Sequence, residues 1–373
     1  MFEAFDEILD ACGKFAAREI VPGVLDADLN PNPEWLKTLR ARSREVGLPG
    51  LLLPEELNGA GQPEACAALV LDALASACAG FASVLAFHLT VCSLALQAEE
   101  RKRTPLLSLL ARPDQASLAA VVLPAAGEEN RIVACRDDGA VRIQGTSALS
   151  GSAEVADLFL VFARQEGHEE GTVCLVVDRA CEGLSVGENA ELPGLRVNAF
   201  AELAFDRVQL GPEDVLFEGP PAAQALAKAQ RLLHSFVAAM SMGVSRAAFQ
   251  KAYAYAGERY QFGKMIIRHQ EIQRMLGEML AKLQAGTAAY FHLFSGEKCG
   301  LPLSAANSGL VKAFCTDAAL AIVTDAIQIH GGYGYMHEYG MEKRMRDAKV
   351  LQLLGGSGPW LEVEAIAQTL GSG

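Results

Sequence analysis

Four short segments in the last third of the chain contain side chains suited to a phosphorylated ligand. They are residues 259–264, 268–270, 328–335 and 345–349. Arg259 offers a planar fork of donors that matches a pyrophosphate or an adenylate phosphate. Gln270 and Gln328 supply neutral donors and acceptors, and Gly331 and Gly332 let the backbone come close to a ligand. The segments therefore predict binding of a ligand with phosphate groups.

In order and spacing, these segments resemble the C-terminal domain of the acyl-CoA dehydrogenases, the FAD enzymes that desaturate acyl thioesters. In that family they hold the adenine and pyrophosphate end of an FAD bound mainly by a neighbouring subunit. The resemblance implies FAD binding by seven residues: Arg259, Phe262, His269, Gln270, Gln328, Gly331 and Gly332. Singly, such segments are more often structural, since a Gly-Gly after an apolar helix is usually a cap. Four of them in order make chance agreement negligible.

No acid stands where the family carries its catalytic base. Removing the α-proton of a thioester usually requires a desolvated carboxylate of raised pKa. The family reads Tyr-Glu-Gly-Thr after Arg-Asp-Ala-Lys, whereas residues 353–357 here read Leu-Leu-Gly-Gly-Ser, which puts Gly355 in place of the glutamate. In some members a Glu-Arg pair on an earlier helix serves instead, and it falls on Leu233 and His234. The chain is thus an atypical member of the family, and its catalytic residues stay unassigned.

Two segments that contact the flavin ring in the family are also altered. Thr-Glu-Pro followed by Gly-Ser-Asp corresponds to residues 121–128, where Val122 cannot donate a hydrogen bond and no Ser-Asp follows. Gly-x-Lys-x-Trp-Ile-Thr corresponds to residues 145–151, which lack a tryptophan, although Ser150 keeps a hydroxyl. The chain keeps the motifs that act across a subunit interface and has lost those that act in its own site.

Three hypotheses compete. The chain could be a subunit that donates FAD-binding motifs to a catalytic partner of the same family. It could instead be a flavin-dependent monooxygenase or biosynthetic enzyme, with His234 as acid or base, although a lone helical histidine is more often structural. The third is a non-catalytic flavin-binding or scaffolding protein. Ordinary dehydrogenase activity with a displaced base is a residual alternative.

Hydrophobic periodicity indicates the elements that position these residues. Residues 1–112 are predicted to be helical, with positions 2, 5, 9, 12 and 15 on one face and Ala-rich helices at 64–79 and 81–98. From 113 to 218 hydrophobic residues alternate with a period of two, which predicts a small antiparallel sandwich or barrel. Its predicted strands are 117–122, 140–144, 157–163, 172–178 and 201–210.

Residues 217–221 are predicted to be a linker. Helices are expected at 222–258, 269–294, 304–329 and 359–370, with breaks at Gly263, 296–302 and 331–340. The prediction is an α+β protein with an N-terminal helical domain (1–112), a central antiparallel β domain (113–218) and a C-terminal four-helix bundle (219–373). The acyl-CoA dehydrogenases have this architecture.

Composition limits the partners. A net charge of −13 argues against nucleic acid or an anionic membrane, but local basic residues could still hold a CoA ester. Nine cysteines without a C-x-x-C pair indicate neither a metal site nor a disulfide framework. We expect no apolar run of the roughly 18 residues that a membrane span needs, and the acidic amphipathic N-terminus does not resemble a signal peptide, so a cytoplasmic location is expected.

The resemblance implies further partners. They are an acyl-CoA or acyl-carrier thioester, an electron-transfer flavoprotein as electron acceptor, and a homo- or hetero-oligomer built as a dimer of dimers.

Overall fold

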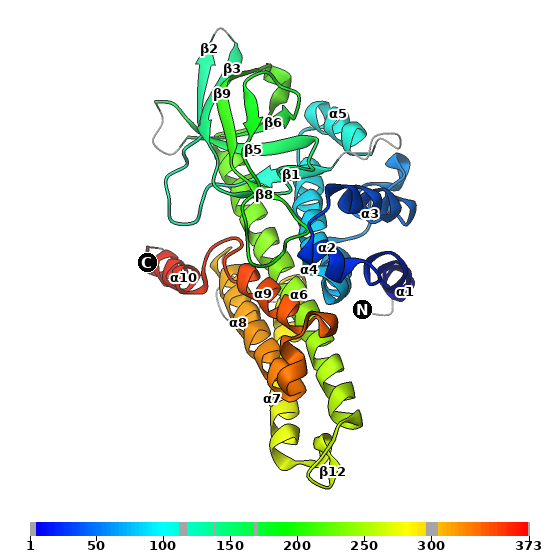
Figure 1. The fold of residues 1–373 in the computed structure, drawn as a ribbon. Helices are drawn as coiled ribbons and strands as arrows, with labels where there is room; N and C mark the ends of the chain where they lie inside the picture. The colour runs from blue at the N-terminus through cyan, green and yellow to red at the C-terminus, as the bar shows by residue number, and fades with distance from the viewer. Residues whose placement is uncertain (1–4, 112–117, 138, 168–170, 296–304, 372–373) are drawn as a thin grey trace.

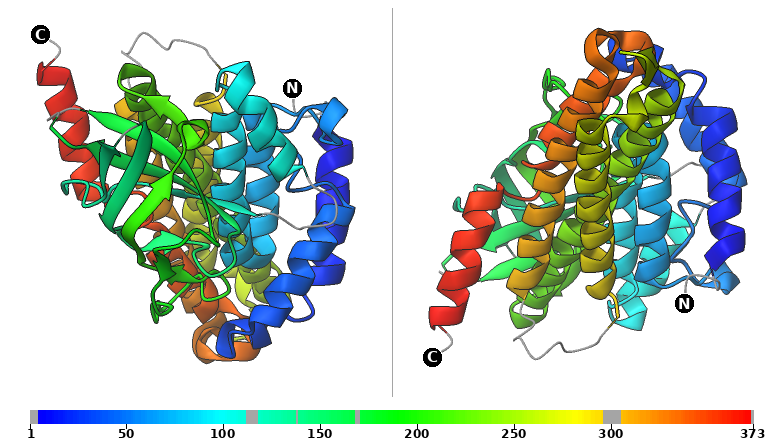
Figure 2. Two further views of the ribbon diagram at one scale, coloured as in Figure 1. Left: turned by 90° about the horizontal axis from the view of Figure 1, so that it is seen from above. Right: turned by 90° about the horizontal axis from the view of Figure 1, so that it is seen from below.

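A computed structural model describes residues 5–111, 118–137, 139–167, 171–295 and 305–371 (Figure 1). The β-sheet lies at one end of the molecule, and long helices run away from it toward the other end. The two termini lie on opposite sides of the helices (Figure 2). Some predicted features lie outside the described residues. They are position 2 of the first helix face, the first predicted strand's start and the domain boundary within 112–117, and the predicted break at 296–302.

Within residues 5–111, the N-terminal part has five α-helices. They are α1 (Asp6–Phe15), α2 (Val24–Leu29), α3 (Pro33–Glu45), α4 (Glu64–Ala95) and α5 (Glu100–Leu110). The helix α4 is kinked at Cys78, whose backbone leaves the helical region at φ −152° and ψ 103°. The Cys78 sulfur accepts from the Phe81 backbone N–H at 3.4 Å, so it caps the second half of α4. The two predicted helices at 64–79 and 81–98 are the halves on either side of this kink.

Among the described residues, α4 and α6 (Pro220–Glu258) are long and apolar enough to cross a membrane by length and composition alone, which the estimate from run length missed. Buried core helices of other proteins pass the same test. The most apolar windows of α4 and α6 are 83% and 89% buried inside the fold. The two helices pack so closely that a Cβ on Gly243 of α6 would lie 2.0 Å from the Asp72 carbonyl oxygen of α4. Their apolar length serves this contact in the core.

The central part is a mixed β-sheet. Its strands are β1 (Ala119–Val122), β2 (Val133–Asp137), β3 (Ala140–Thr146), β5 (Leu158–Gln165), β6 (Thr172–Asp178), β7 (Leu184–Val186), β9 (Leu203–Leu210) and β10 (Val215–Glu218). They run in the order β10-β6-β5-β2-β3-β9-β7, with β1 paired to β5. The predicted β domain is confirmed, and most pairings are antiparallel. However, β1 and β2 each pair with β5 in parallel, because alternation predicts a buried face and carries no information on strand direction.

A separate two-stranded ladder joins β4 (Ser150–Gly151) to β8 (Phe200–Ala201). The predicted linker at 217–221 was wrong in extent. Residues 217 and 218 belong to β10, and α6 begins at Pro220, because proline is favoured in the first turn of a helix. Only Gly219, at φ +63°, joins the two elements.

The described residues of the C-terminal part form five α-helices. They are α6, α7 (Gln270–His292), α8 (Ala305–His330), α9 (Met341–Leu351) and α10 (Gly358–Gly371). The short hairpin of β11 (Tyr260–Gln261) and β12 (Lys264–Met265) lies at the end of the bundle that is farthest from the sheet (Figure 1). The four predicted helices are present. The helix α9 was missed, because its charged sequence has no wide apolar stripe.

His88 connects α4 to the sheet. Its Nδ1 accepts from the Ala119 backbone N–H at 3.1 Å, so Nε2 carries the proton and donates to the Pro49 carbonyl at 3.1 Å. The side chain is fully buried, and burial lowers its pKa to about 4. His88 is therefore a neutral structural histidine.

We expect this histidine to make the protein less stable in acid. Between pH 6.5 and about 4 the unfolded chain takes up a proton at His88 that the folded chain does not, so stability falls as the pH is lowered through this window. Urea unfolding of wild type and His88→Gln across the window measures the effect. The stability advantage of the wild type should shrink toward the acid end, and a constant difference would contradict the assignment.

Candidate functional site

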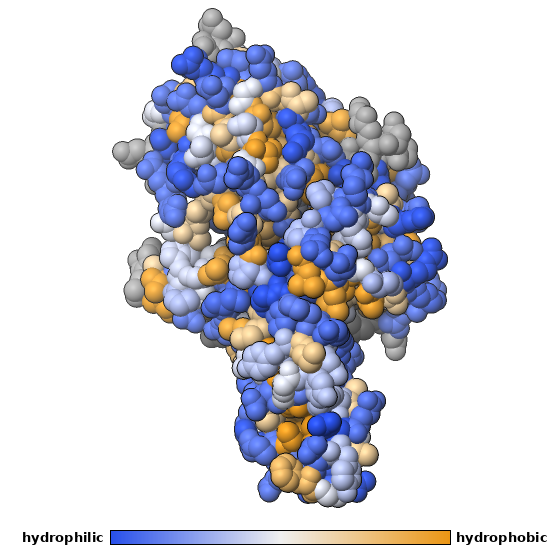
Figure 3. All heavy atoms as spheres, in the orientation of Figure 1, coloured by the Kyte–Doolittle hydropathy of each residue, from blue (hydrophilic) through white to orange (hydrophobic). Residues whose placement is uncertain are grey.

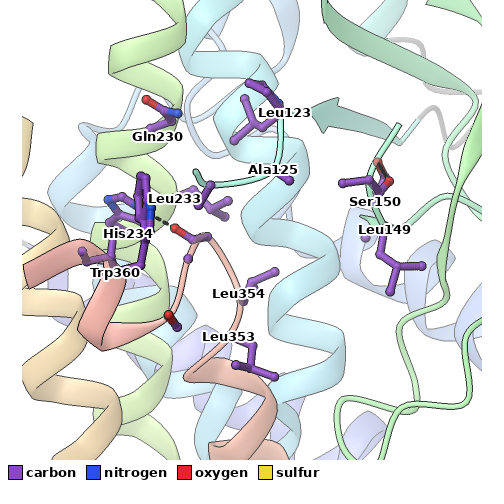
Figure 4. Close-up of a pocket in the computed structure, with 18 of the residues that line it drawn as sticks. Leu123, Ala125, Leu149, Ser150, Gln230, Leu233, His234, Leu353, Leu354 and Trp360 are labelled. Atoms are coloured by element: carbon purple, nitrogen blue, oxygen red, sulfur yellow. Dashed lines mark hydrogen bonds between the residues drawn. The ribbon is translucent and has the colours of Figure 1, made fainter. Parts of the chain in front are cut away.

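A cavity of about 680 Å³ lies where the three parts of the chain meet (Figure 4). Its walls include Leu123 and Ala125 after β1, Leu149 and Ser150 around β4, Leu233 and His234 of α6, Leu353 and Leu354 after α9, and Trp360 of α10. Segments 121–128 and 145–151 and both positions of the family's glutamate thus line one space. Most of this surface is apolar, so the cavity suits an apolar group.

The two positions at which the resemblance places the family's glutamate, Gly355 and Leu233, lie close together. Gly355 has φ +77°, and a Cβ there would lie 3.9 Å from Leu233 Cδ2 and 3.1 Å from His234 Cδ2. The Gly355 carbonyl accepts from His234 Nε2 at 2.7 Å (dashed in Figure 4). The imidazole therefore stands beside the position where a residue-355 side chain would begin.

His234 is held as a neutral ring. A carbonyl can only accept, so Nε2 carries the proton, and Nδ1 lies 3.4 Å from the Ser308 hydroxyl. Burial lowers the His234 pKa to about 4. With both ring nitrogens engaged and the ring neutral, the arrangement is that of a structural histidine that supports the loop after α9.

Lys312 supports the same loop from the other side. This fully buried lysine of α8 donates to the carbonyl oxygens of Gln352 at 2.7 Å and Gly356 at 2.5 Å, just beyond the end of α9. Burial lowers its pKa to about 7. A cation is favoured at the C-terminal end of a helix. Lys312 was not predicted as a site residue, although it is the single lysine of a mostly apolar helix, which is a detectable signal.

Carboxylates reach the cavity from positions other than 233 and 355. Within the described residues, Glu128, Glu202 and Glu364 line it, and Glu364 of α10 is the one that is partly buried. Burial raises the Glu364 pKa, while Gln368 donates to this carboxylate at 3.3 Å. The hydroxyl of Ser150, which the altered segment 145–151 keeps, is buried and donates to the Ala148 carbonyl at 3.2 Å.

A second hollow, of about 760 Å³, lies at the far end of the bundle. Five of the seven predicted FAD-binding residues line it: Arg259, Phe262, His269, Gly331 and Gly332. The other two, Gln270 and Gln328, are exposed on neighbouring helix ends and lie outside its lining. We call this hollow the bundle-end groove.

The bundle-end groove is open and aromatic. Phe262 is 90% exposed at the hairpin tip, with φ +49°, and its ring meets His269 edge-to-face at 6.3 Å. The Arg259 guanidinium lies 6.0 Å from the centroid of the Tyr333 ring. A Cβ on Gly331 or Gly332 would meet nothing within 4 Å, so their backbone is accessible. Apolar atoms reach the surface at this narrow end (Figure 3).

The groove and the cavity are far apart. Arg259 follows His234 by 25 residues, almost all within α6. At the rise of an α-helix this separation is about 38 Å. A dinucleotide held in the cavity of one chain therefore does not reach the groove of the same chain.

The segment 345–349 contributes mainly to packing. Arg346 pairs with Asp28 and Glu342, and it donates to the Pro193 carbonyl at 2.6 Å. Asp347 accepts from Lys343 at 2.6 Å and from the Leu195 backbone N–H at 2.7 Å. These contacts tie α9 to the N-terminal part and to the loop before β8.

Three family models match the chain in order. The acyl-CoA dehydrogenase N-terminal, middle and C-terminal domains match residues 3–112, 124–208 and 219–370. The chain is 28% identical over 353 residues to an acyl-CoA dehydrogenase of Bacillus subtilis, which covers 92% of both proteins. It is 27% identical over 350 residues to a 3-(aryl)acrylate reductase of Clostridium sporogenes, again over 92% of both.

A solved structure has a similar fold. Butyryl-CoA dehydrogenase from Megasphaera elsdenii matches with a TM-score of 0.88, over 98% of this chain and 97% of that one. At 23% sequence identity, this likeness shows the fold alone.

Proposed function

Because the chain belongs to the acyl-CoA dehydrogenase family in all three of its parts, we propose that it is the subunit of an FAD-dependent oxidoreductase that acts on an acyl thioester. In this role it lacks the base and lends its bundle-end groove to a catalytic partner. The observation that carries the proposal is the roughly 38 Å between the groove, which keeps its motif residues, and the cavity, which has lost them.

The chemistry of the groove fits the phosphate and adenine end of FAD. Arg259 would hold a phosphate, and the accessible backbone at Gly331 and Gly332 would lie close to the ligand. The exposed rings of Phe262 and Tyr335, which are 90% and 77% accessible, suit burial against a second subunit. When bound, FAD supplies the hydride acceptor for desaturation. The partner is a related subunit that keeps the base, in a hetero-oligomer, with an electron-transfer flavoprotein as acceptor.

The chain's own cavity supplies binding and support. Its apolar walls exclude water from an acyl group, while His234 and Lys312 hold the loop that carries Gly355. Neither Gly355 nor the Leu233–His234 pair offers a carboxylate to an α-proton.

Measuring flavin per chain tests the proposal. Purified alone, the protein should be colourless or weakly flavinylated and inert. Adding a co-encoded homologue should restore both flavin and desaturation. A stable yellow protein that consumes reduced flavin and oxygen would support a monooxygenase instead and overturn the proposal.

We expect Arg259→Gln to weaken FAD retention in the reconstituted complex by roughly 10- to 100-fold, because a charge-assisted contact to phosphate is lost. Equilibrium dialysis of FAD against the complex measures the change. Arg268→Gln is the matched control, since this exposed arginine of the same hairpin region lies outside the groove. Equal losses in the two variants would contradict the role of Arg259.

One observation favours a second candidate, independent desaturation with a displaced base. Glu364 lines the cavity, and burial raises its pKa, as a general base at this site requires. Under this alternative the chain alone desaturates an acyl thioester, and Glu364→Gln abolishes that activity. An inactive lone chain excludes it.

A further inference from the structure

Two phenylalanines stand together in the wall of the cavity. Phe87 of α4 and Phe200 of β8 both line it, and both side chains are 4% exposed. Their rings meet edge-to-face, with centroids 6.3 Å apart and an angle of 75° between the planes. We call this pair the end wall.

The end wall is held in place by the β4–β8 ladder. Gly151 of β4 is paired with Phe200 of β8, which fixes the second ring beside the Gly151 backbone. The Phe87 ring packs on Gly151 so closely that a Cβ there would lie 2.1 Å from its Cε2. Gly151 is therefore required for space, and the Phe87 ring has little room to swing toward the sheet.

The cavity has no extension between α4 and α6 behind the end wall. Among the described residues of α4, Phe87 alone lines the cavity, and α6 contributes residues between 227 and 234. The next residues inward, Val84 and Leu85 on α4 and Val237 and Ala238 on α6, are at most 1% exposed and outside its lining. The two helices close on each other there with small side chains.

We propose that the end wall restricts this site to short or compact acyl groups, with Phe87 and Phe200 as the residues that determine chain length. The proposal rests on the proposed function, in which the cavity takes the acyl part of a thioester. A longer straight chain would have to displace pinned aromatic rings or leave its end in water. Each methylene that stays in water loses the free energy of burial, which lowers the affinity about fourfold.

Isothermal titration of the full-length chain with butanoyl, octanoyl and hexadecanoyl thioesters tests the proposal. Each acyl group is offered on CoA and on pantetheine, so that recognition of the carrier is separated from recognition of the acyl chain. For the wild type, affinity should stop rising between the butanoyl and octanoyl thioesters. In Phe87→Ala and in Phe200→Ala, the ratio of octanoyl to butanoyl affinity should rise at least tenfold.

Phe81→Ala is the matched control. Phe81 is a buried phenylalanine of the same helix that packs on Phe15, with ring centroids 6.2 Å apart, and it does not line the cavity. Phe87→Leu and Phe200→Leu remove less volume, and they give the same comparison if the alanine variants do not fold.

An affinity that keeps rising with chain length in the wild type overturns the end wall. So does an unchanged ratio in the folded Phe87 and Phe200 variants. Either result leaves the proposed function standing. If no thioester binds to any variant on either carrier, the proposed function itself fails, and the end-wall proposal fails with it.

Discussion

Replacing Asp347 by alanine is expected to lower the free energy of unfolding by about 3–5 kcal/mol, because it leaves a buried lysine without its counterion. The Asp347 and Lys343 side chains are only 2% and 5% exposed, and the carboxylate accepts from Lys343 Nζ at 2.6 Å. Asp347 also accepts from the Leu195 backbone N–H at 2.7 Å, which would lose its partner. Both the charge and the amide would stay inside the protein uncompensated.

Urea unfolding monitored by circular dichroism measures this effect. The control is Glu271→Ala, which breaks the exposed pair between Glu271 and Arg274 and should change little. A double variant, Lys343→Met with Asp347→Leu, should recover most of the loss, since a well-packed apolar pair can replace a buried ion pair. If Asp347→Ala is no less stable than Glu271→Ala, the pair contributes nothing to stability and its place in the motif needs another reason.

Replacing Asp72 by alanine is expected to cost about 3 kcal/mol. Asp72 is 2% exposed and holds two partners from the C-terminal part. Arg246 donates to both of its oxygens, one of them at 2.8 Å, and the Tyr290 hydroxyl donates at 2.6 Å. Because the Arg246 side chain is 34% exposed, water compensates part of the loss, which places this variant at the low end of the range for broken buried pairs.

The Asp72 variants also test whether the N-terminal helices depend on the bundle. Denaturant unfolding gives the stability, and limited proteolysis shows whether α4 is released first. Asp72→Asn is the matched variant, because it keeps the shape and loses the charge. An asparagine variant as stable as the wild type would mean that shape and hydrogen bonding suffice, without the ion pair.

The pattern of the fold was largely predictable because burial repeats locally along each element. The strand β6 was predicted with the residues it has, Thr172–Asp178, and α8 within one residue at each end. The parallel pairings of β1 and β2 with β5 were not predictable, since strand direction depends on segments that are distant in sequence. The helix α9 was missed because three of its side chains, at 343, 346 and 347, are charged groups that are satisfied by partners within the fold.

The candidate site, like the fold, was predictable from the sequence only in part. Residue identity alone determined that Gly355 and Leu233 are not acids and that Arg259 and Gly331 retain the family's pattern, because such motifs are short and local. Five of the seven predicted FAD-binding residues line one groove, and their role in binding FAD stays a prediction.

Only the tertiary structure decided what surrounds these positions. It packs His234 against Gly355, brings Glu364 to the cavity and places Phe87 and Phe200 together in the cavity wall. It also places the bundle-end groove about 38 Å from the cavity. Each of these depends on contacts between elements or on the length of a whole helix, and no local pattern contains that information.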